Sequence, residues 1–179
     1  EMMAAASLLS TSLKFEGRLS LQAQGDGQVR LLMAEITHQH ELRAIARFDG
    51  ELSSVASFQE LLENGRMAIT IEPTQGQRYQ GVVPLDGDTL SECLEAYFVQ
   101  SEQLPTLLKL ASDDEHAAGF MVQAMPSQLS QNTDDWDRIV HLASTLKDEE
   151  LLELDNQSLL YRLYHEEDCR VFEQQDIQF

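Results

Sequence analysis

Polar and apolar residues alternate in two stretches near the start of the chain. Phe15, Leu19 and Leu21 are separated by polar residues, and residues 29–36 form a second stretch rich in strand-forming residues. Successive side chains of a β-strand point to opposite faces, so this alternation is typical of a half-buried strand. Gly25-Asp26-Gly27 lies between the stretches, and we expect its glycines to supply the positive φ angles of a tight turn. The pattern therefore predicts a β-hairpin.

Further strands and short helices are predicted as far as residue 126. Ser57 is placed to cap a short helix, and Asp88 or Thr89 to cap a longer one with Cys93 on its apolar face. Strands and helices follow one another without a regular βαβ order, which favours an α+β fold. The other expected elements are a helix over 1–12, a strand over 42–48, a hairpin over 67–71 and 78–83, and strands over 107–110 and 120–125.

The composition changes at Met125-Pro126. Residues 127–179 contain thirteen acidic and four basic side chains, and their apolar residues recur with helical spacing. Three short helices are predicted there, with Thr145 and Asp148 as the capping pair of the second and Asp155 as the cap of the third. Short helices need a surface on which to pack, so this segment is a candidate for conditional order. Its apolar positions are Trp136, Ile139, Val140, Ala143 and Leu146 in the first helix and Leu159, Leu160 and Leu163 in the third.

Charge and cysteine content exclude several classes of function. The formal net charge is −19 over 179 residues, with a pI near 4.4, and such a field repels nucleic acid and anionic membrane. No apolar run is long enough to cross a bilayer. Two cysteines in a chain of this length do not form a disulfide scaffold, so a reducing compartment, the cytoplasm, is expected.

Motifs with catalytic or metal-binding chemistry all have simpler structural explanations. Gly25-Asp26-Gly27 lacks the Lys-Ser/Thr of a phosphate loop and precedes a strand, so it is interpreted as a turn. His38 and His40 lack further ligands and are interpreted as loop histidines, and residues 165–169 lack zincin spacing. Cys93 is interpreted as a small buried apolar residue. We therefore predict that the chain is not an enzyme.

Seven strings along the chain resemble the heat-shock protein 33 family. They occur in the order of that family and extend over nearly the whole chain, which makes the set specific although each string alone is weak. The strings are Leu13-Lys14-Phe15-Glu16-Gly17, Gln22-Ala23-Gln24-Gly25-Asp26-Gly27, Arg78-Tyr79-Gln80-Gly81-Val82-Val83, Gly87-Asp88-Thr89-Leu90, Cys93-Leu94-Glu95-Ala96-Tyr97-Phe98, Ser101-Glu102-Gln103-Leu104-Pro105-Thr106 and Arg162-Leu163-Tyr164-His165-Glu166-Glu167.

The resemblance implies an ATP-independent holdase chaperone that binds unfolding proteins under oxidative stress. In that family a C-terminal domain holds zinc through four cysteines in a CxC and CxxC arrangement, and oxidation forms disulfides, releases the zinc and loosens the preceding linker. We expect those cysteines beyond Phe179 and some tens of residues before Glu1. Cys93 and Cys169 are not expected to be zinc ligands, so we predict no metal or other cofactor in this chain.

Applied to this sequence, the resemblance predicts a body over residues 1–126 and an acidic helical linker over 127–179. The predicted partners are unfolded client proteins, with a second copy of the chain as a candidate partner on activation. The alternatives are an enzyme of small molecules with catalytic groups outside this sequence, and a structural dimerisation module. The candidate client-binding or linker-interface residues are Trp136, Ile139, Val140, Leu146, Leu159, Leu160 and Leu163.

Overall fold

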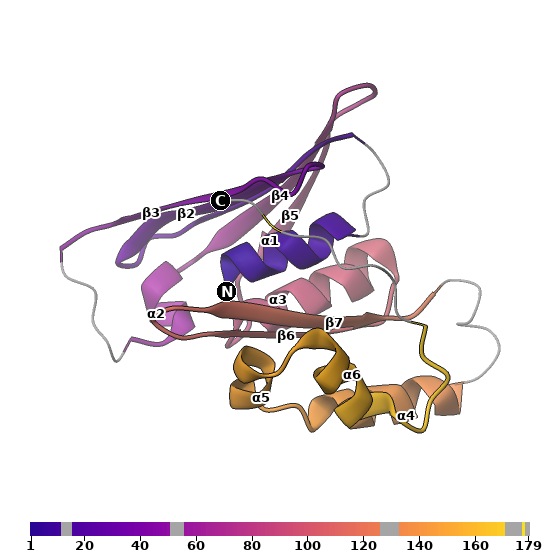
Figure 1. Ribbon diagram of the computed structural model, residues 1–179. Helices are drawn as coiled ribbons and strands as arrows, with labels where there is room; N and C mark the ends of the chain where they lie inside the picture. The colour runs from indigo at the N-terminus through magenta and orange to yellow at the C-terminus, as the bar shows by residue number, and fades with distance from the viewer. Residues whose placement is uncertain (12–15, 51–55, 126–132, 171–176, 178–179) are drawn as a thin grey trace. The chain divides into compact units, whose positions relative to one another are not determined.

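The chain forms two compact units of mixed helix and sheet. The computed structural model describes residues 1–11, 16–50, 56–125, 133–170 and 177. Unit 1 comprises residues 1–94 and 175–179, and unit 2 comprises residues 95–174. Antiparallel strands and helices alternate along the chain, which confirms the predicted α+β class (Figure 1).

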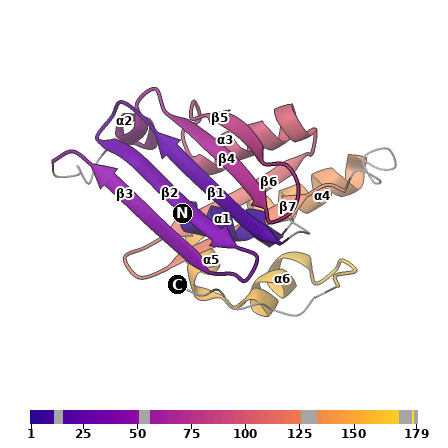
Figure 2. The ribbon, with the colours of Figure 1, turned by 90° about the horizontal axis from the view of Figure 1, so that it is seen from above.

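Unit 1 is built on a five-stranded antiparallel sheet with the strand order β3-β2-β1-β4-β5. Figure 2 looks onto this sheet and shows its strands side by side. The elements of this unit are α1 (Met2–Thr11), β1 (Gly17–Gln24), β2 (Val29–Thr37), β3 (Leu42–Phe48), α2 (Phe58–Leu62), β4 (Arg66–Pro73), β5 (Tyr79–Pro84) and the start of α3 (Leu90–Tyr97).

The apolar face of the sheet follows from the alternation seen in the sequence. Leu19, Leu21 and Ala23 of β1 are all buried, and each stands in register with apolar residues of β2 and β4. Helix α1 packs against β1, β2 and β3 and buries Ala4–Ala6 and Leu9. The small alanine side chains allow the helix to approach the sheet closely, so this layer is the core of unit 1.

The turn between β1 and β2 corrects one expectation about its glycines. Neither Gly25 nor Gly27 has a positive φ angle, in contrast to Gly50, where φ is 71°. A Cβ atom on Gly25 would instead clash with the carbonyl oxygen of Leu62, because the end of helix α2 lies directly against the turn. These glycines are needed for close approach of the backbone and not for an unusual backbone angle.

Unit 2 pairs a β-hairpin with three helices. Strands β6 (Thr106–Ser112) and β7 (Ala117–Gln123) form a two-stranded antiparallel sheet. The helices are α4 (Thr133–Ser144), α5 (Asp148–Glu153) and α6 (Asn156–Tyr164), and a π-helical turn, η1 (Phe98–Glu102), follows α3.

The caps of the helices agree with the sequence in three cases and differ in one. Ser57, Thr89 and Asp155 cap α2, α3 and α6 as predicted, since their side chains accept backbone N–H groups of the first turn. Helix α5 was expected to begin from a pair formed by Thr145 and Asp148, but Lys147 holds the N-cap position. The Thr145 hydroxyl donates to the Leu142 carbonyl at the end of α4 instead. The predicted domain boundary at residue 126 lies outside the described residues and stays a prediction.

Replacing Leu21 with alanine should destabilise unit 1 strongly. Its side chain is 0% exposed at the centre of the sheet, so the truncation should cost about 2–5 kcal/mol of unfolding free energy. Guanidinium denaturation followed by circular dichroism measures the change. Gln24→Ala, at an exposed position of the same strand, is the control and should change the free energy by less than about 0.5 kcal/mol. Equal effects of the two variants would contradict this packing.

Candidate functional site

One face of the β6–β7 hairpin carries mostly apolar side chains. Cross-strand pairs place residues of both strands on this face, because directly opposed residues point the same way. The pairs are Leu107 with Val122, Lys109 with Phe120, and Ala111 with Ala118. We call this set the hairpin face. All six of its members except Lys109 are apolar, so it needs a partner that excludes water.

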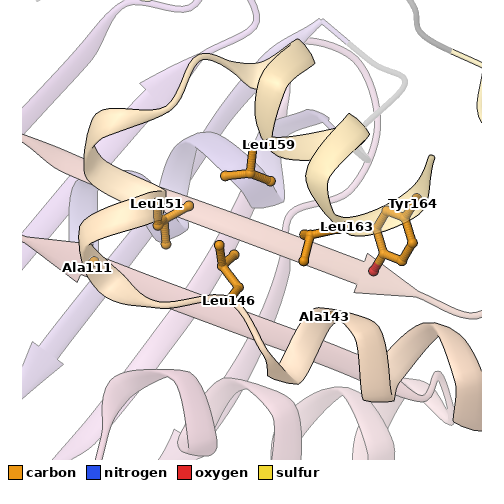
Figure 3. Close-up of a cluster of buried hydrophobic side chains, with 7 residues drawn as sticks. All are labelled: Ala111, Ala143, Leu146, Leu151, Leu159, Leu163 and Tyr164. Atoms are coloured by element: carbon orange, nitrogen blue, oxygen red, sulfur yellow. The ribbon is translucent and has the colours of Figure 1, made fainter.

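The three helices of unit 2 provide that partner. Apolar side chains of these helices and of the turn between α4 and α5 gather into one buried cluster over the hairpin, with Leu146, Leu151, Leu159 and Leu163 pointing toward one another (Figure 3). None of these four leucines is more than 7% exposed. Leu107, Ala118, Phe120 and Val122 of the hairpin face pack against this cluster, and Ala111 belongs to it.

The three helices depend on this packing for their stability. Helix α5 has 6 residues and α6 has 9, and isolated helices shorter than about 12 residues are marginal in water. Burial of each leucine contributes roughly 1.5–3 kcal/mol. The helices therefore depend on the hairpin face, and the hairpin face depends on the helices for its cover.

Polar contacts fix the position of the helices on the apolar face. The ammonium group of Lys109 donates to the Leu146 carbonyl at 3.1 Å, just after the end of α4. The Tyr164 hydroxyl donates to the Ile139 carbonyl at 3.3 Å, and its ring stacks on Phe120 with centroids 6.4 Å apart. Burial raises the pKa of Tyr164 to about 12, so the phenol stays a hydrogen-bond donor at neutral pH.

Two arginines join parts of this segment that are separate in the sequence. Arg138 of α4 binds both carboxylate oxygens of Glu167, which follows α6, at 2.8 and 3.1 Å, and also Asp135 of its own helix at 2.9 Å. Arg162 of α6 binds Glu150 of α5 at 2.8 Å and the Thr145 hydroxyl at 2.7 Å. We call these two groups the arginine clamps. They hold together a segment whose acidic side chains otherwise repel one another.

The carboxylates of this segment are held in their charged form. The hydrogen bond from Arg138 lowers the pKa of Glu167. The backbone N–H of Lys147, and then Arg162, lower the pKa of Glu150. The hydroxyl and backbone N–H of Ser158 lower the pKa of Asp155, the cap of α6. All three groups stabilise the helical arrangement only while they are ionised.

The structure places the predicted interface residues in two groups. Five of the seven contribute to the cluster over the hairpin: Leu146, Leu159 and Leu163 are buried in it, and Ile139 and Leu160 pack against it. Trp136 and Val140 are half-buried on α4 and lie outside that cluster. The role of these seven residues in client binding stays a prediction.

Sequence reasoning missed the partners on the other side of this interface. Leu107, Phe120 and Val122 were assigned to strands, but which strand face they shared depended on the pairing register. Leu151 and Tyr164 were also not singled out, although both are buried in the cluster. Leu151 and Leu159 do not share one helical period, because Leu151 lies on α5 and Leu159 on α6, with a turn between the two helices.

The cysteines and histidines show no arrangement suited to metal binding in the described part of the chain. Cys93 is 3% exposed in unit 1, and its sulfur accepts the Gly87 N–H at 3.3 Å. Cys169 belongs to unit 2 and is exposed. His38 and His40 follow the end of β2 in a turn. Among the described residues, no group of three His, Cys, Asp or Glu side chains is placed to hold a metal ion. The residues present therefore do not fit a zinc site of the four-cysteine kind.

A depression in unit 1 beside helix α2 has a polar lining without catalytic chemistry. Ser57 and Glu60 in its wall are engaged in the reciprocal capping of α2. Gln59 donates to the Asp86 carbonyl at 3.1 Å. These groups support local structure and do not converge on a common point. Every helix within the described ranges is too short or too polar to cross a lipid bilayer.

Comparison with known sequences identifies the family. The sequence model of the Hsp33 protein family matches residues 1–179. The chain therefore belongs to the Hsp33 family.

Among its relatives are two proteins named 33 kDa chaperonin. The one from Ectopseudomonas mendocina (strain ymp) is 50% identical over 184 residues, and the one from Aeromonas salmonicida (strain A449) is 46% identical over 183 residues. Both matches cover 100% of this chain and 62% of the relative, so the chain spans less than two thirds of their length.

A solved structure has the same fold. The crystal structure of the 33 kDa chaperonin (heat shock protein 33 homolog) from Thermotoga maritima matches with a TM-score of 0.77. The match covers 99% of this chain and 64% of that one, at 21% identity. At this identity the likeness shows the fold alone.

Acid should loosen the three helices before it unfolds unit 1. The pKa values of Glu150 and Glu167 lie below their ordinary value of 4.5 in the folded chain. Their contribution to stability is therefore complete above that pH and is lost as the pH falls through the lowered values. Trp136, the single tryptophan, lies on α4, so its emission spectrum should shift over this range.

The double variant Arg138→Gln, Arg162→Gln is the control for this acid response. Without the clamps the Glu167 carboxylate should titrate near its ordinary value, whereas Glu150 keeps the hydrogen bond from the Lys147 N–H and loses only part of its pKa shift. The acid-induced change in Trp136 emission should therefore be smaller than in the parent chain. A variant with the same pH profile as the parent chain would show that the clamps do not cause the response.

Proposed function

We propose that this chain is the major part of an ATP-independent holdase chaperone that binds unfolding proteins and prevents their aggregation. The observation that carries the proposal is the hairpin face, an apolar surface covered by three helices that are too short to persist alone. The names of the relatives, 33 kDa chaperonin, support the same function. Unfolded proteins expose apolar side chains, so an apolar surface that becomes available matches them chemically.

In this proposal, activation is the displacement of the linker helices. Release exposes Leu107, Phe120 and Val122 on the hairpin, and Leu159 and Leu163 on α6. The surfaces are complementary in the closed state, so each can then bind a client segment of similar apolar character. The linker thus acts as the cover and supplies part of the exposed area itself.

Redox control in the full-length protein is assigned to cysteines that this sequence does not contain. A cysteine reacts with peroxide as the thiolate. Burial raises the pKa of the Cys93 thiol, which lowers its thiolate fraction and makes it a poor sensor. We therefore place the zinc-linked switch of the family outside residues 1–179, and propose that loss of that switch frees the linker.

The proposed partners are unfolded clients in the cytoplasm, and a second copy of the chain on activation. The proposed action is stoichiometric, since the described residues show no convergent catalytic groups around the depression beside α2. No observation favours the alternative of a small-molecule enzyme.

Truncation of Leu163 should activate the chaperone. Leu163 is 3% exposed in the cluster, so Leu163→Ala should weaken the closed state by about 2–5 kcal/mol. Since 1.4 kcal/mol is a factor of ten, the open population should rise more than about tenfold. The measurement is light scattering of a chemically unfolded client diluted into the chain, which should aggregate less with the variant.

Tyr161→Ala is the matched control on the same helix, because the Tyr161 side chain is 72% exposed. Hydrogen exchange should show faster exchange over residues 134–164 in Leu163→Ala and unchanged exchange in Tyr161→Ala. If the linker opens in Leu163→Ala while client aggregation is not suppressed, the covered surface is not the client-binding surface.

Suppression of aggregation by this chain should be independent of peroxide. The expected result is equal suppression with and without peroxide, for the parent chain and for Cys93→Ser and Cys169→Ser. A peroxide response lost in Cys93→Ser alone would give that buried cysteine a regulatory role and would contradict the placement of the switch outside this sequence.

A further inference from the structure

The face of the unit 1 sheet opposite its buried leucines carries an unusual concentration of arginine. The residues of β1 that alternate with Leu19 and Leu21 point to this face, and so do the residues that stand opposite them on the neighbouring strands. Within the strands these include four arginines and two glutamates, a formal charge of +2 in a chain whose net charge is −19. The arginines are Arg18, Arg43, Arg47 and Arg66, and the glutamates are Glu35 and Glu72. We call this surface the arginine face.

The two glutamates are already neutralised at one end of the arginine face. Glu72 binds Arg18 at 2.6 Å and lies 3.4 Å from Arg78, which precedes β5. Glu35 binds Arg43 at 2.7 Å and is itself largely buried. Glu41, which precedes β3, offsets the added charge of Arg78. This end of the face therefore has little charge left to attract a partner.

The other end of the arginine face has cationic groups without carboxylate partners. No ion pair joins Arg47 of β3 or Arg66 of β4 to another described residue, and both are exposed. In register, Arg47 stands opposite Leu31, Leu31 opposite Gln24, and Gln24 opposite Arg66. The two arginines are thus three strand spacings apart, about 14 Å.

An uncharged row of side chains crosses the sheet beside these arginines. It runs from Ile45 through Met33, Gln22 and Ala68 to Val82, as the register of the five strands requires. Ile45 is 53% exposed and Val82 is 60% exposed. Exposed aliphatic side chains at both ends of the row offer apolar contact that the two arginines flank.

We infer that the arginine face is a docking surface for acidic, aliphatic segments of unfolded client proteins. The inference rests on the proposed function, because unfolded clients supply such segments in extended form. A separation of about 14 Å matches two carboxylates about four residues apart in an extended chain. The residues between them would lie along the row from Ile45 to Val82.

Electrostatics and side-chain chemistry both select this partner. The Debye length is about 8 Å at physiological salt, so a bound segment experiences chiefly the local arginines and only weakly the distant acidic groups of the chain. Single-stranded nucleic acid binds through aromatic stacking together with positive charge. The uncharged row contains no aromatic side chain, which favours polypeptide side chains over bases.

The test uses the 179-residue chain and short fluorescein-labelled peptides that share one aliphatic sequence. The peptides carry glutamate, glutamine or lysine at two positions four residues apart, and a labelled single-stranded oligonucleotide serves as a further probe. Fluorescence anisotropy at about 0.15 M salt should show the glutamate peptide binding about two- to fivefold more tightly than the glutamine peptide, as expected for exposed ion pairs. The difference should shrink at about 1 M salt, where the local ion pairs are screened as well.

Arg47→Gln and Arg66→Gln should each remove most of the preference for glutamate. Arg170→Gln is the matched control, because Arg170 is exposed in unit 2 and joined by no ion pair to another described residue. Equal loss in Arg170→Gln would show that only the total charge matters and would overturn the inference. Equal affinity for the glutamate and glutamine peptides, tighter binding of the lysine peptide, or preferred binding of the oligonucleotide would overturn it as well.

Failure of this inference is distinguishable from failure of the proposed function. A chaperone that uses only the hairpin face would still suppress aggregation in Leu163→Ala, whatever the charge of the client. If instead no client is protected while the glutamate peptide binds through Arg47 and Arg66, the docking surface stands and the holdase proposal is wrong.

Discussion

The mutual burial of four leucines and the hairpin face determines how unit 2 can behave. Leu151 belongs to α5, Leu159 and Leu163 belong to α6, and Leu146 lies in the turn between α4 and α5. Neither α5 nor α6 has enough internal hydrogen bonding to persist in water without this contact. Because the helices have no other source of stability of comparable size, their order is all-or-none with respect to this contact. A modest loss of packing therefore changes the exposed apolar surface abruptly, which is the property that a conditional binding surface requires.

Repulsion between acidic side chains opposes the packing of these helices, and the basic residues of the segment counter it. The segment from 127 to 179 has thirteen acidic and four basic residues. Two of the four bases form the clamps: Arg162 joins α6 to α5, and Arg138 joins α4 to Glu167 after α6. Exposed ion pairs of this type contribute at most about 1 kcal/mol each. The leucines thus provide most of the stability, and the clamps set which helix neighbours which. Acidic composition keeps the same segment soluble once it is released.

Local patterns in the sequence predicted the elements well, and relations between elements poorly. Alternation located β1 and β2, and side-chain chemistry located the caps Ser57 and Asp155, because those features depend on neighbours in the chain. The role of Gly25 was misassigned, since the reason for it is the carbonyl of Leu62, far away in the sequence. The sequence predicted neither the hairpin face nor the arginine face, for the same reason. Each depends on cross-strand register, in which Lys109 meets Phe120 and Gln24 meets Arg66.

The two surfaces differ in when they are available and in what they recognise. The hairpin face is covered until the linker is displaced, whereas the exposed side chains of Arg47, Arg66, Ile45 and Val82 need no such step. An acidic client segment held weakly at the arginine face would present the rest of its chain to the same molecule at a high effective concentration, provided that both surfaces can be reached together. Weak, charge-selective contact would then precede apolar binding. Clients would be chosen by an electrostatic step and retained by a hydrophobic one, so salt would affect the first contact far more than the stability of the final complex.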